Sequence, residues 1–280
     1  MRKLLTSLRL ELAKIFLMRG TYVGYGIVAA VTFLTIWGLW RFHPVQQMSR
    51  RLGNDMVVGG KMMTGLMPAR YVMGPALLVL IPMLIAAIVG GLVAGEGKSG
   101  VLRGWLCRPV SRLTLITAKQ LAAWIHALSL TVFLGLVALG LGYLFFGGGD
   151  LVDIMSGDGM VILDERLGLI RMALAYGLAA YVMCGFASLT LMASVIFENP
   201  MVAAASAVAF LPVATIIGNL EYFEFLKPYL LTNYFDIWRH AFKGTVALGD
   251  FLPGLYCITG YCVIPYVIGA VVFWRKDVTS

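Results

Sequence analysis

Six long apolar stretches determine what this chain is able to fold into. Each is about as long as, or longer than, the roughly 20 apolar residues that an α-helix needs to cross a bilayer. Hydrophobic residues make up 60% of the 280 residues and charged residues only 13%, which excludes an ordinary soluble domain. The predicted spans are roughly Thr21–Trp40, Tyr71–Ala94, Leu113–Phe146, Leu167–Phe197, Met201–Leu220 and Phe251–Trp274.

These spans predict an all-α integral membrane protein with six transmembrane helices, in which residues 1–280 form a single membrane domain. Too few residues remain outside the spans for a separate soluble catalytic domain. No Asp or Glu falls inside a predicted span, whereas carriers coupled to protons or sodium usually hold carboxylates there. We therefore expect that the chain is not an enzyme, has no catalytic residues and performs no energy-coupling chemistry of its own.

Two basic side chains of the third predicted span need an explanation. Lys119 lies near the end of that span, and we expect its long side chain to reach the membrane surface. His126 lies in the middle of the same span. We interpret it as a neutral, hydrogen-bonded packing residue, with a proton relay or a ligand contact as the alternative.

Residues 1–19 form a basic leader before the first span. No small-residue cleavage site follows before Trp40, which argues against a signal peptide. The leader predicts an amphipathic helix that lies along the inner membrane surface, and an irregular basic segment is the alternative. Its apolar residues recur on one helical face, which comprises Leu5, Leu8, Leu12, Ile15 and Phe16.

The segment between the second and third spans predicts a contact with a cytosolic partner. Ser99 is suited to cap the start of a helix, and Pro109 ends it. We expect a short helix over Ser99–Arg108 whose apolar face points away from the bilayer. That face comprises Val101, Leu102, Trp105 and Leu106.

Charge indicates the orientation of the chain only weakly, because Lys and Arg are just slightly more numerous on the side of the leader. The leader and the segment Lys98–Arg112 lie on the same side, since two spans separate them. We take that side to be the cytosol, which places both termini there.

The sequence offers no site for a nucleotide or a metal ion in this chain. Gly97-Lys98-Ser99 looks like the end of a phosphate-binding loop, but the glycine required five positions earlier is Leu92, and an apolar span precedes it instead of a strand. The methionines between the first two spans lack a supporting Cys or His cluster. We interpret them as adaptable apolar side chains.

The stretch Glu221–Gly244 before the last span is rich in aromatic and charged residues and is interrupted by Pro228. It is too polar to cross a bilayer, and Tyr and Trp favour the membrane interface. It predicts two short helices at the outer interface. An aromatic belt that extends the sixth span is the alternative.

Three segments are similar to those of a known family of membrane proteins. They are Glu11-Leu12-Ala13-Lys14, Glu96 with Gly100–Lys119 around Arg108-Pro109-Val110-Ser111-Arg112, and Thr232-Asn233-Tyr234. Together with the order of the spans, they resemble the permease subunits of type-2 ATP-binding-cassette exporters, over nearly the whole chain. Arg103 departs from the pattern, because many relatives carry an acidic residue there.

The resemblance implies a half-transporter of the bacterial cytoplasmic (inner) membrane that exports a hydrophobic or amphipathic substrate. ATP and magnesium would bind a separate cassette-type ATPase subunit, so this chain would hold no cofactor and no metal. A second permease copy, identical or related, and membrane lipid would be its other partners, with no nucleic acid. The residues implied at the ATPase contact are Glu11, Lys14, Glu96, Val101, Leu102, Arg103, Trp105, Leu106, Arg108, Pro109 and Arg112.

The apolar spans do not identify substrate-binding residues, and a lipid, a hydrophobic peptide or a drug-like amphiphile would all suit them. Two other kinds of protein stay open from the sequence. One is a self-contained secondary transporter or channel, which the missing carboxylates disfavour. The other is a membrane anchor or assembly factor that recruits a soluble partner.

Overall fold

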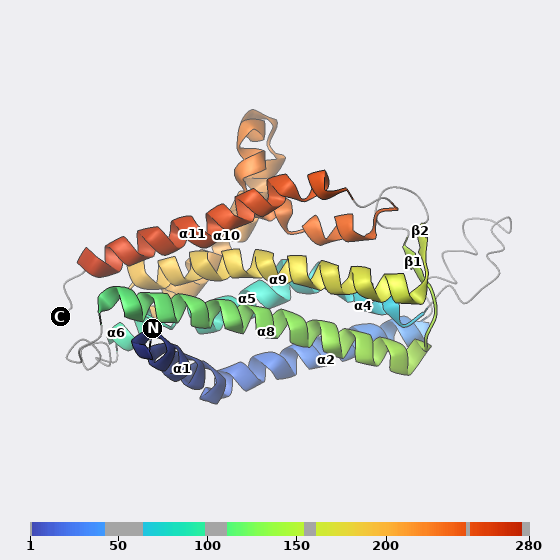
Figure 1. Cartoon of the computed structure of the whole chain (residues 1–280), viewed down its shortest axis with the longest axis horizontal. Coiled ribbons are helices and arrows are strands. Elements are labelled where there is room, and N and C mark those ends of the chain that lie inside the picture. The colour runs from blue at the N-terminus through green and yellow to red at the C-terminus, as the bar shows by residue number, and fades with distance from the viewer. Residues whose placement is uncertain (1, 43–63, 99–110, 154–160, 245–246, 276–280) are drawn as a thin grey trace.

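The computed structural model describes residues 2–42, 64–98, 111–153, 161–244 and 247–275 (Figure 1). Among these residues, six helical segments are long and apolar enough to cross a membrane. The expectation of a helical protein with six candidate spans is therefore confirmed. The segments are α2 (Arg19–Phe42), Leu66–Lys98, α8 (Arg112–Phe146), α9 (Glu165–Ile196), α10 (Pro200–Asn219) and α11 (Leu252–Arg275).

The second segment is not one regular helix. Its parts are α4 (Leu66–Pro75), the π-helix η1 (Ala76–Leu80), α5 (Ile81–Val89) and α6 (Ala94–Lys98). Pro75 and Pro82 flank η1, and each removes a backbone donor, so the regular hydrogen-bond ladder is interrupted there. A second break over residues 90–93 begins at the pair Gly90-Gly91, because glycine is a poor helix former.

Helix α9 forms the centre of the bundle, and α8, α11, α5 and α10 pack around it. In its most apolar stretch 78% of the residues are buried, against 22% in α2, α10 and α11. One serine joins α9 to α8, since Ser188 Oγ accepts hydrogen bonds of 2.8 Å from Gln120 Nε2 and from Trp124 Nε1. Such polar contacts hold helices together where hydrocarbon offers no competing partner.

The leader is helical, as expected, and forms α1 (Arg2–Leu17), which packs against α8. Its buried residues are Ser7, Glu11 and Ile15, spaced four apart on one face. Leu5, in contrast, is 54% exposed. Most of the expected apolar face nevertheless meets the bundle, since Leu8 and Leu12 pack against its core and Phe16 lies beside the His126 ring of α8. The face also includes the polar Ser7 and Glu11, because the bundle offers Glu11 a charged partner.

The two ends of the bundle differ (Figure 1). At one end, here called the terminal end, α1 begins, α6 and α8 lie close together and α11 ends. The opposite end, here called the hairpin end, carries β1 (Leu151–Asp153) and β2 (Val161–Leu163), which pair antiparallel with Leu151 opposite Leu163. We expected only helices from the sequence, and the strand pair corrects that expectation; strands of three residues leave little periodic signal in a sequence.

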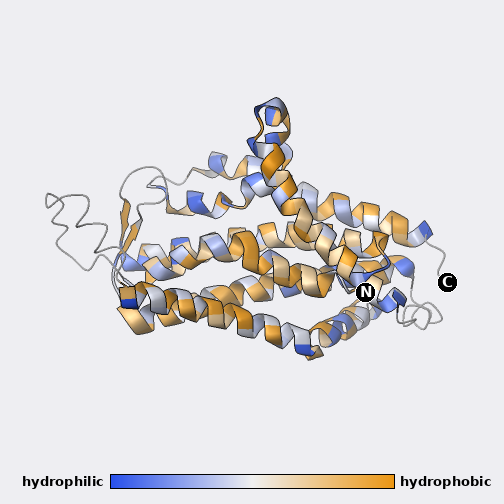
Figure 2. Cartoon of the chain, turned by 180° about the vertical axis from the view of Figure 1, so that it is seen from behind, coloured by the Kyte–Doolittle hydropathy of each residue, from blue (hydrophilic) through white to orange (hydrophobic). Residues whose placement is uncertain are grey.

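The segment before α11 corrects a second expectation. It forms three 3₁₀-helices rather than two interfacial helices: η2 (Glu221–Tyr229), η3 (Leu231–Tyr234) and η4 (Ile237–Phe242), followed by η5 (Leu248–Asp250). The backbone becomes extended at Leu230, two residues after Pro228, which ends η2. In both views η2 projects sideways from the middle of the bundle, whereas η4 packs against α9 (Figures 1 and 2).

Candidate functional site

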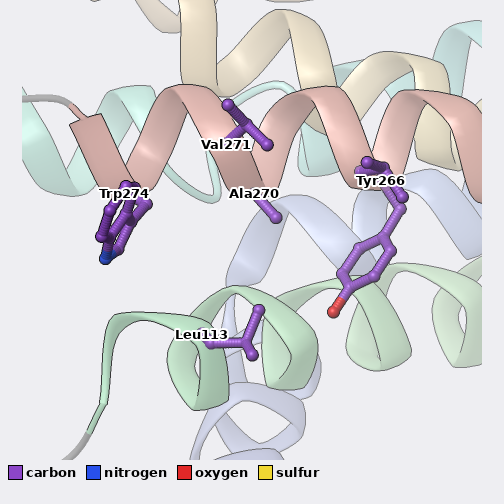
Figure 3. Close-up of a pocket in the computed structure, with 6 residues that line it drawn as sticks. Leu113, Tyr266, Ala270, Val271 and Trp274 are labelled. Atoms are coloured by element: carbon purple, nitrogen blue, oxygen red, sulfur yellow. The ribbon is translucent and has the colours of Figure 1, made fainter.

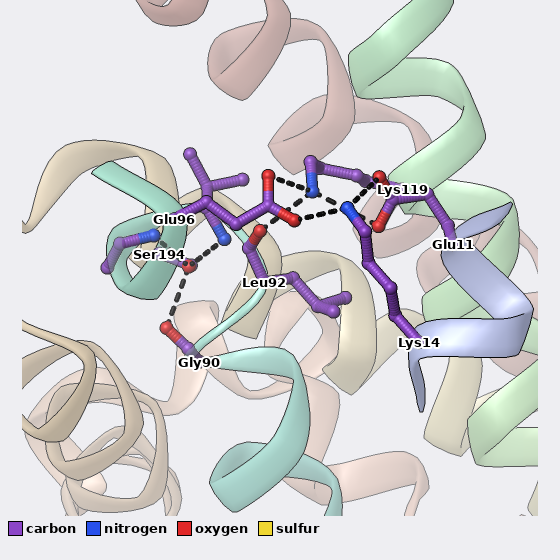
Figure 4. A network of polar contacts seen from close by, with 9 residues as sticks. Glu11, Lys14, Gly90, Leu92, Glu96, Lys119 and Ser194 are labelled. Carbon is purple, nitrogen blue, oxygen red and sulfur yellow. Dashed lines mark hydrogen bonds and ion pairs between the residues drawn. The ribbon is translucent and has the colours of Figure 1, made fainter. Parts of the chain in front are cut away.

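Four charged side chains from three helices meet at the terminal end (Figure 4). Glu11 and Lys14 come from α1, Glu96 from α6 and Lys119 from α8. We call this group the charge cluster. It holds two carboxylates and two ammonium groups, so its formal charges cancel.

Each carboxylate of the cluster bridges both ammonium groups. Lys14 Nζ lies 3.1 Å from Glu11 Oε1 and 2.7 Å from Glu96 Oε1. Lys119 Nζ lies 3.1 Å from Glu11 Oε2 and 2.8 Å from Glu96 Oε2. The four ion pairs therefore form a closed ring in which positive and negative groups alternate.

The ring is largely withdrawn from solvent. The side chains of Glu11 and Lys119 are 0% exposed and that of Glu96 is 14% exposed, whereas Lys14 keeps 34%. Removing charges from water is costly, and only close pairing with good hydrogen bonds offsets the cost. Lys119 meets this condition, because its third contact is a 2.8 Å hydrogen bond to the carbonyl of Leu92.

The break before α6 is what brings Glu96 to the ring. Ser194 of α9 fixes that break, since its Oγ donates to the carbonyl of Gly90 at 2.7 Å. The same oxygen accepts the backbone N–H groups of Val93 and Ala94, both at 3.1 Å. Backbone groups freed by the two glycines are thereby satisfied within the bundle.

The surroundings also change the pKa of Lys14, the most exposed member of the cluster. Burial pulls the pKa of Lys14 down, but the hydrogen bond from Lys14 to Glu96 and the charges of Glu11 and Glu96 outweigh it. The pKa of Lys14 therefore lies above its ordinary value of 10.5. Lys14 is thus charged across the physiological pH range.

The charge cluster joins three helices at the terminal end. It ties α1 to α6 and α8, and these two helices flank residues 99–110 in the sequence. Two of the four ion pairs make this link, Lys14–Glu96 to α6 and Lys119–Glu11 to α8. Within the described part of the chain, no group of three or more His, Cys, Asp or Glu side chains is placed to hold a metal ion.

The residues expected at a partner contact fall into three groups. Glu11, Lys14 and Glu96 meet in the cluster. Arg112 lies apart from it and donates from Nη1 to the carbonyls of Phe273 and Trp274 of α11, at 3.5 and 2.9 Å. The others lie outside the described residues, and they are Val101, Leu102, Arg103, Trp105, Leu106, Arg108 and Pro109.

Sequence reasoning missed Lys119 as a member of the site. We expected its ammonium to reach the membrane surface, but the structure buries it between Glu11 and Glu96, because two carboxylates and a backbone carbonyl surround it there. The sequence did contain a signal for these ion pairs, since Glu11 and Glu96 are predicted at the same end of the spans as Lys119. His126 is buried and packs beside the Phe16 ring, as expected of a packing residue. The expected hydrogen bond is absent, since neither of its ring nitrogens has a partner among the described residues.

Comparison with known proteins places the chain in a family. Residues 51–279 match the model of a family described as a protein of unknown function, DUF2705. The chain belongs to this family. In this DUF2705 protein Glu96 and Lys119 lie inside the matched region, whereas Glu11 and Lys14 precede it.

The DUF2705 protein is also similar to an uncharacterized protein, YhcI, of Bacillus subtilis (strain 168). The two are 24% identical over 200 residues, which cover 69% of this chain and 63% of the relative. The match thus spans less than two thirds of the length of the relative. Neither description names an activity, a substrate or a partner.

Proposed function

We propose that this chain is the transmembrane permease subunit of an ATP-binding-cassette exporter, which uses ATP hydrolysed by a separate subunit. The observation that carries the proposal is the charge cluster at the terminal end. It links the leader helix to the two helices that flank residues 99–110, the segment that we expect to bind the ATPase. The six candidate spans are in accord with this role.

In this proposal the terminal end faces the cytosol of a bacterium, and both termini lie there. Closure of the ATPase dimer moves the segment 99–110, whose contact residues are Val101, Leu102, Trp105 and Leu106. The buried ion pairs resist separation, so α6, α8 and α1 move together. The spans then tilt and release a hydrophobic or amphipathic substrate outward.

A second permease copy is part of the proposal, and η2 supports it. This element has no buried residue, and its exposed side chains include Tyr222 and Phe225 together with the charged Glu221, Glu224 and Lys227. It projects beside the middle of the bundle, where a bilayer would surround it (Figure 2). A charged side chain in hydrocarbon costs about 2.5–3.5 kcal/mol, so cover by protein is favoured over lipid.

Copurification tests the proposal most directly. The tagged chain, isolated from membranes of its native host in mild detergent, is expected to carry a cassette-type ATPase in stoichiometric amount. The double change Trp105→Ala and Leu106→Ala is expected to abolish stimulation of that ATPase by the permease. Leu144→Ala, at an exposed position of α8 near the hairpin end, is the matched control and leaves the stimulation unchanged.

Two outcomes would contradict the proposal. Transport by the chain alone in liposomes, without nucleotide, would identify a self-contained transporter or channel. A stable complex with a soluble protein that hydrolyses no ATP would identify an anchor or assembly factor.

The isolated chain is expected to bind no ATP, and Lys98→Ala is expected to leave ATP binding by the complex unchanged.

A further inference from the structure

A cleft of about 380 Å³ lies between α8 and α11 at the terminal end (Figure 3). Its volume falls in the range of roughly 300–1,000 Å³ typical of ligand clefts. The cleft opens on the outer surface of the bundle, since Leu113 is 60% and Trp274 71% exposed. Its lining is almost wholly apolar and comprises Leu113, Tyr266, Val267, Ala270, Val271 and Trp274.

Two polar contacts hold the two helices on either side of this cleft. Near its outer mouth, Arg112 donates to the carbonyl of Trp274 at 2.9 Å. Further along the helices, the hydroxyls of Thr117 and Tyr266 lie 2.7 Å apart in a hydrogen bond. The Tyr266 hydroxyl is therefore satisfied, and the tyrosine presents its ring to the cleft. These contacts brace α8 and α11 at both ends of an apolar slot.

The mouth of the cleft is cationic. Arg275 follows Trp274 in the last turn of α11 and is exposed, and among the described residues it forms no ion pair. The carbonyls at the end of a helix carry partial negative charge, which repels anions. Arg112 donates to two of these carbonyls and so offsets that repulsion.

We propose that this cleft binds one anionic phospholipid from the leaflet at the terminal end. An acyl chain lies in the slot against Ala270 and Leu113, and the headgroup phosphate lies at Arg275 and Arg112. Trp274 sits at the level of the headgroups, where indole rings are favoured. The occupant is a lipid because the slot opens toward the hydrocarbon and its only charged neighbours among the described residues lie at the end where headgroups are found. The inference rests on the membrane-spanning helices and not on the proposed ATPase partner.

Native mass spectrometry of the purified, delipidated chain tests this proposal. Phosphatidylglycerol and phosphatidylcholine with the same acyl chains are titrated separately. We expect one phosphatidylglycerol per chain to bind about tenfold more tightly than phosphatidylcholine. Arg275→Gln is expected to reduce this preference about fivefold, and Ala270→Phe to remove the tight site by filling the slot.

Matched controls separate the cleft from general effects on the membrane surface. Arg19→Gln removes an exposed arginine at the start of α2, and Ala30→Phe enlarges an exposed alanine of α2, away from the cleft. Both are expected to leave the tight site intact. Equal affinity for the two lipids, or a preference that survives both Arg275→Gln and Ala270→Phe, would overturn the proposal. Size-exclusion profiles identify a variant that fails to fold. If one of Arg275→Gln and Ala270→Phe fails, the lipid preference of the other variant tests the proposal.

Discussion

At the scale of single residues, Lys119 shows how a charge is accommodated inside an apolar helix. Its ammonium donates hydrogen bonds to Glu11 Oε2 and to the carbonyl of Leu92, and it forms an ion pair with Glu96. Glu11 is buried as completely and contacts both lysines. Each of these two residues is tolerated in the interior because oppositely charged groups surround it, and each is a partner of the other.

Removing the carboxylate of Glu11 is therefore expected to destabilise the protein. Glu11→Gln leaves the buried Lys119 with one carboxylate instead of two, and loss of a buried ionic partner costs about 3 kcal/mol. Thermal unfolding in detergent measures the effect. Asp164→Asn, at an exposed position, is the control and should be close to neutral. The double variant Glu11→Gln with Lys119→Met is expected to lose less than the sum of the single variants.

Lys14 gives the cluster a defined dependence on pH. Because the pKa of Lys14 is raised in the folded protein, its contribution to stability is complete below the unfolded value of 10.5 and is lost as the pH rises through the folded value. The difference in unfolding temperature between wild type and Lys14→Met is expected to stay constant from about pH 6 to 9. It should shrink above about pH 10.5. A difference that shrinks as the pH is lowered from 9 to 6 would contradict this assignment.

At the scale of helices, Gly90 permits both the break before α6 and close packing against α10. A Cβ atom at this position would lie 2.6 Å from the carbonyl oxygen of Ala86 and 3.0 Å from the Cβ of Ala204. Both distances are shorter than van der Waals contact. The position of Glu96 in the charge cluster thus depends on a glycine six residues earlier.

Gly90→Val is expected to separate α5 from α10 and to weaken the charge cluster, with a loss of about 1–3 kcal/mol from overpacking. The unfolding temperature in detergent reports the loss. Gly177→Ala is the matched control, since nothing lies within 4 Å of a Cβ there. By helix propensity alone it should be neutral or stabilise by up to about 1 kcal/mol. Equal effects of the two changes would show that Gly90 is not a point of close contact.

At the scale of the whole molecule, the six candidate spans predict which residues share a side of the membrane. In a variant without native cysteines, single cysteines at Lys98 and Arg275 are expected to react with an impermeant thiol reagent from the same side. A cysteine at Asp164, at the hairpin end, is expected to react only from the other side. Reaction of Lys98→Cys and Asp164→Cys from one side would refute the six-span arrangement.

The sequence by itself determined the helical spans and the leader, because both are encoded in local composition and periodicity. Length and apolar content alone predicted six spans, to within about five residues of the helices observed. The breaks within Leu66–Lys98 were also encoded, by Pro75, Pro82 and the glycine pair at 90–91, although we did not use that signal. Glu11, Lys14 and Glu96 were selected through a family resemblance, which did not predict that they contact one another.

Only the tertiary structure decided which charges meet. Lys119 is separated from Glu11 by 108 positions in the sequence, and no local pattern links residues so far apart. Their contact follows from the packing of α1 on α8 and from the turn that Ser194 stabilises, and both are long-range. The cleft between α8 and α11 is also decided by the tertiary structure, because it forms only where the surfaces of these two helices meet. A burial pattern in one helix specifies one face but not the partner that the face will meet.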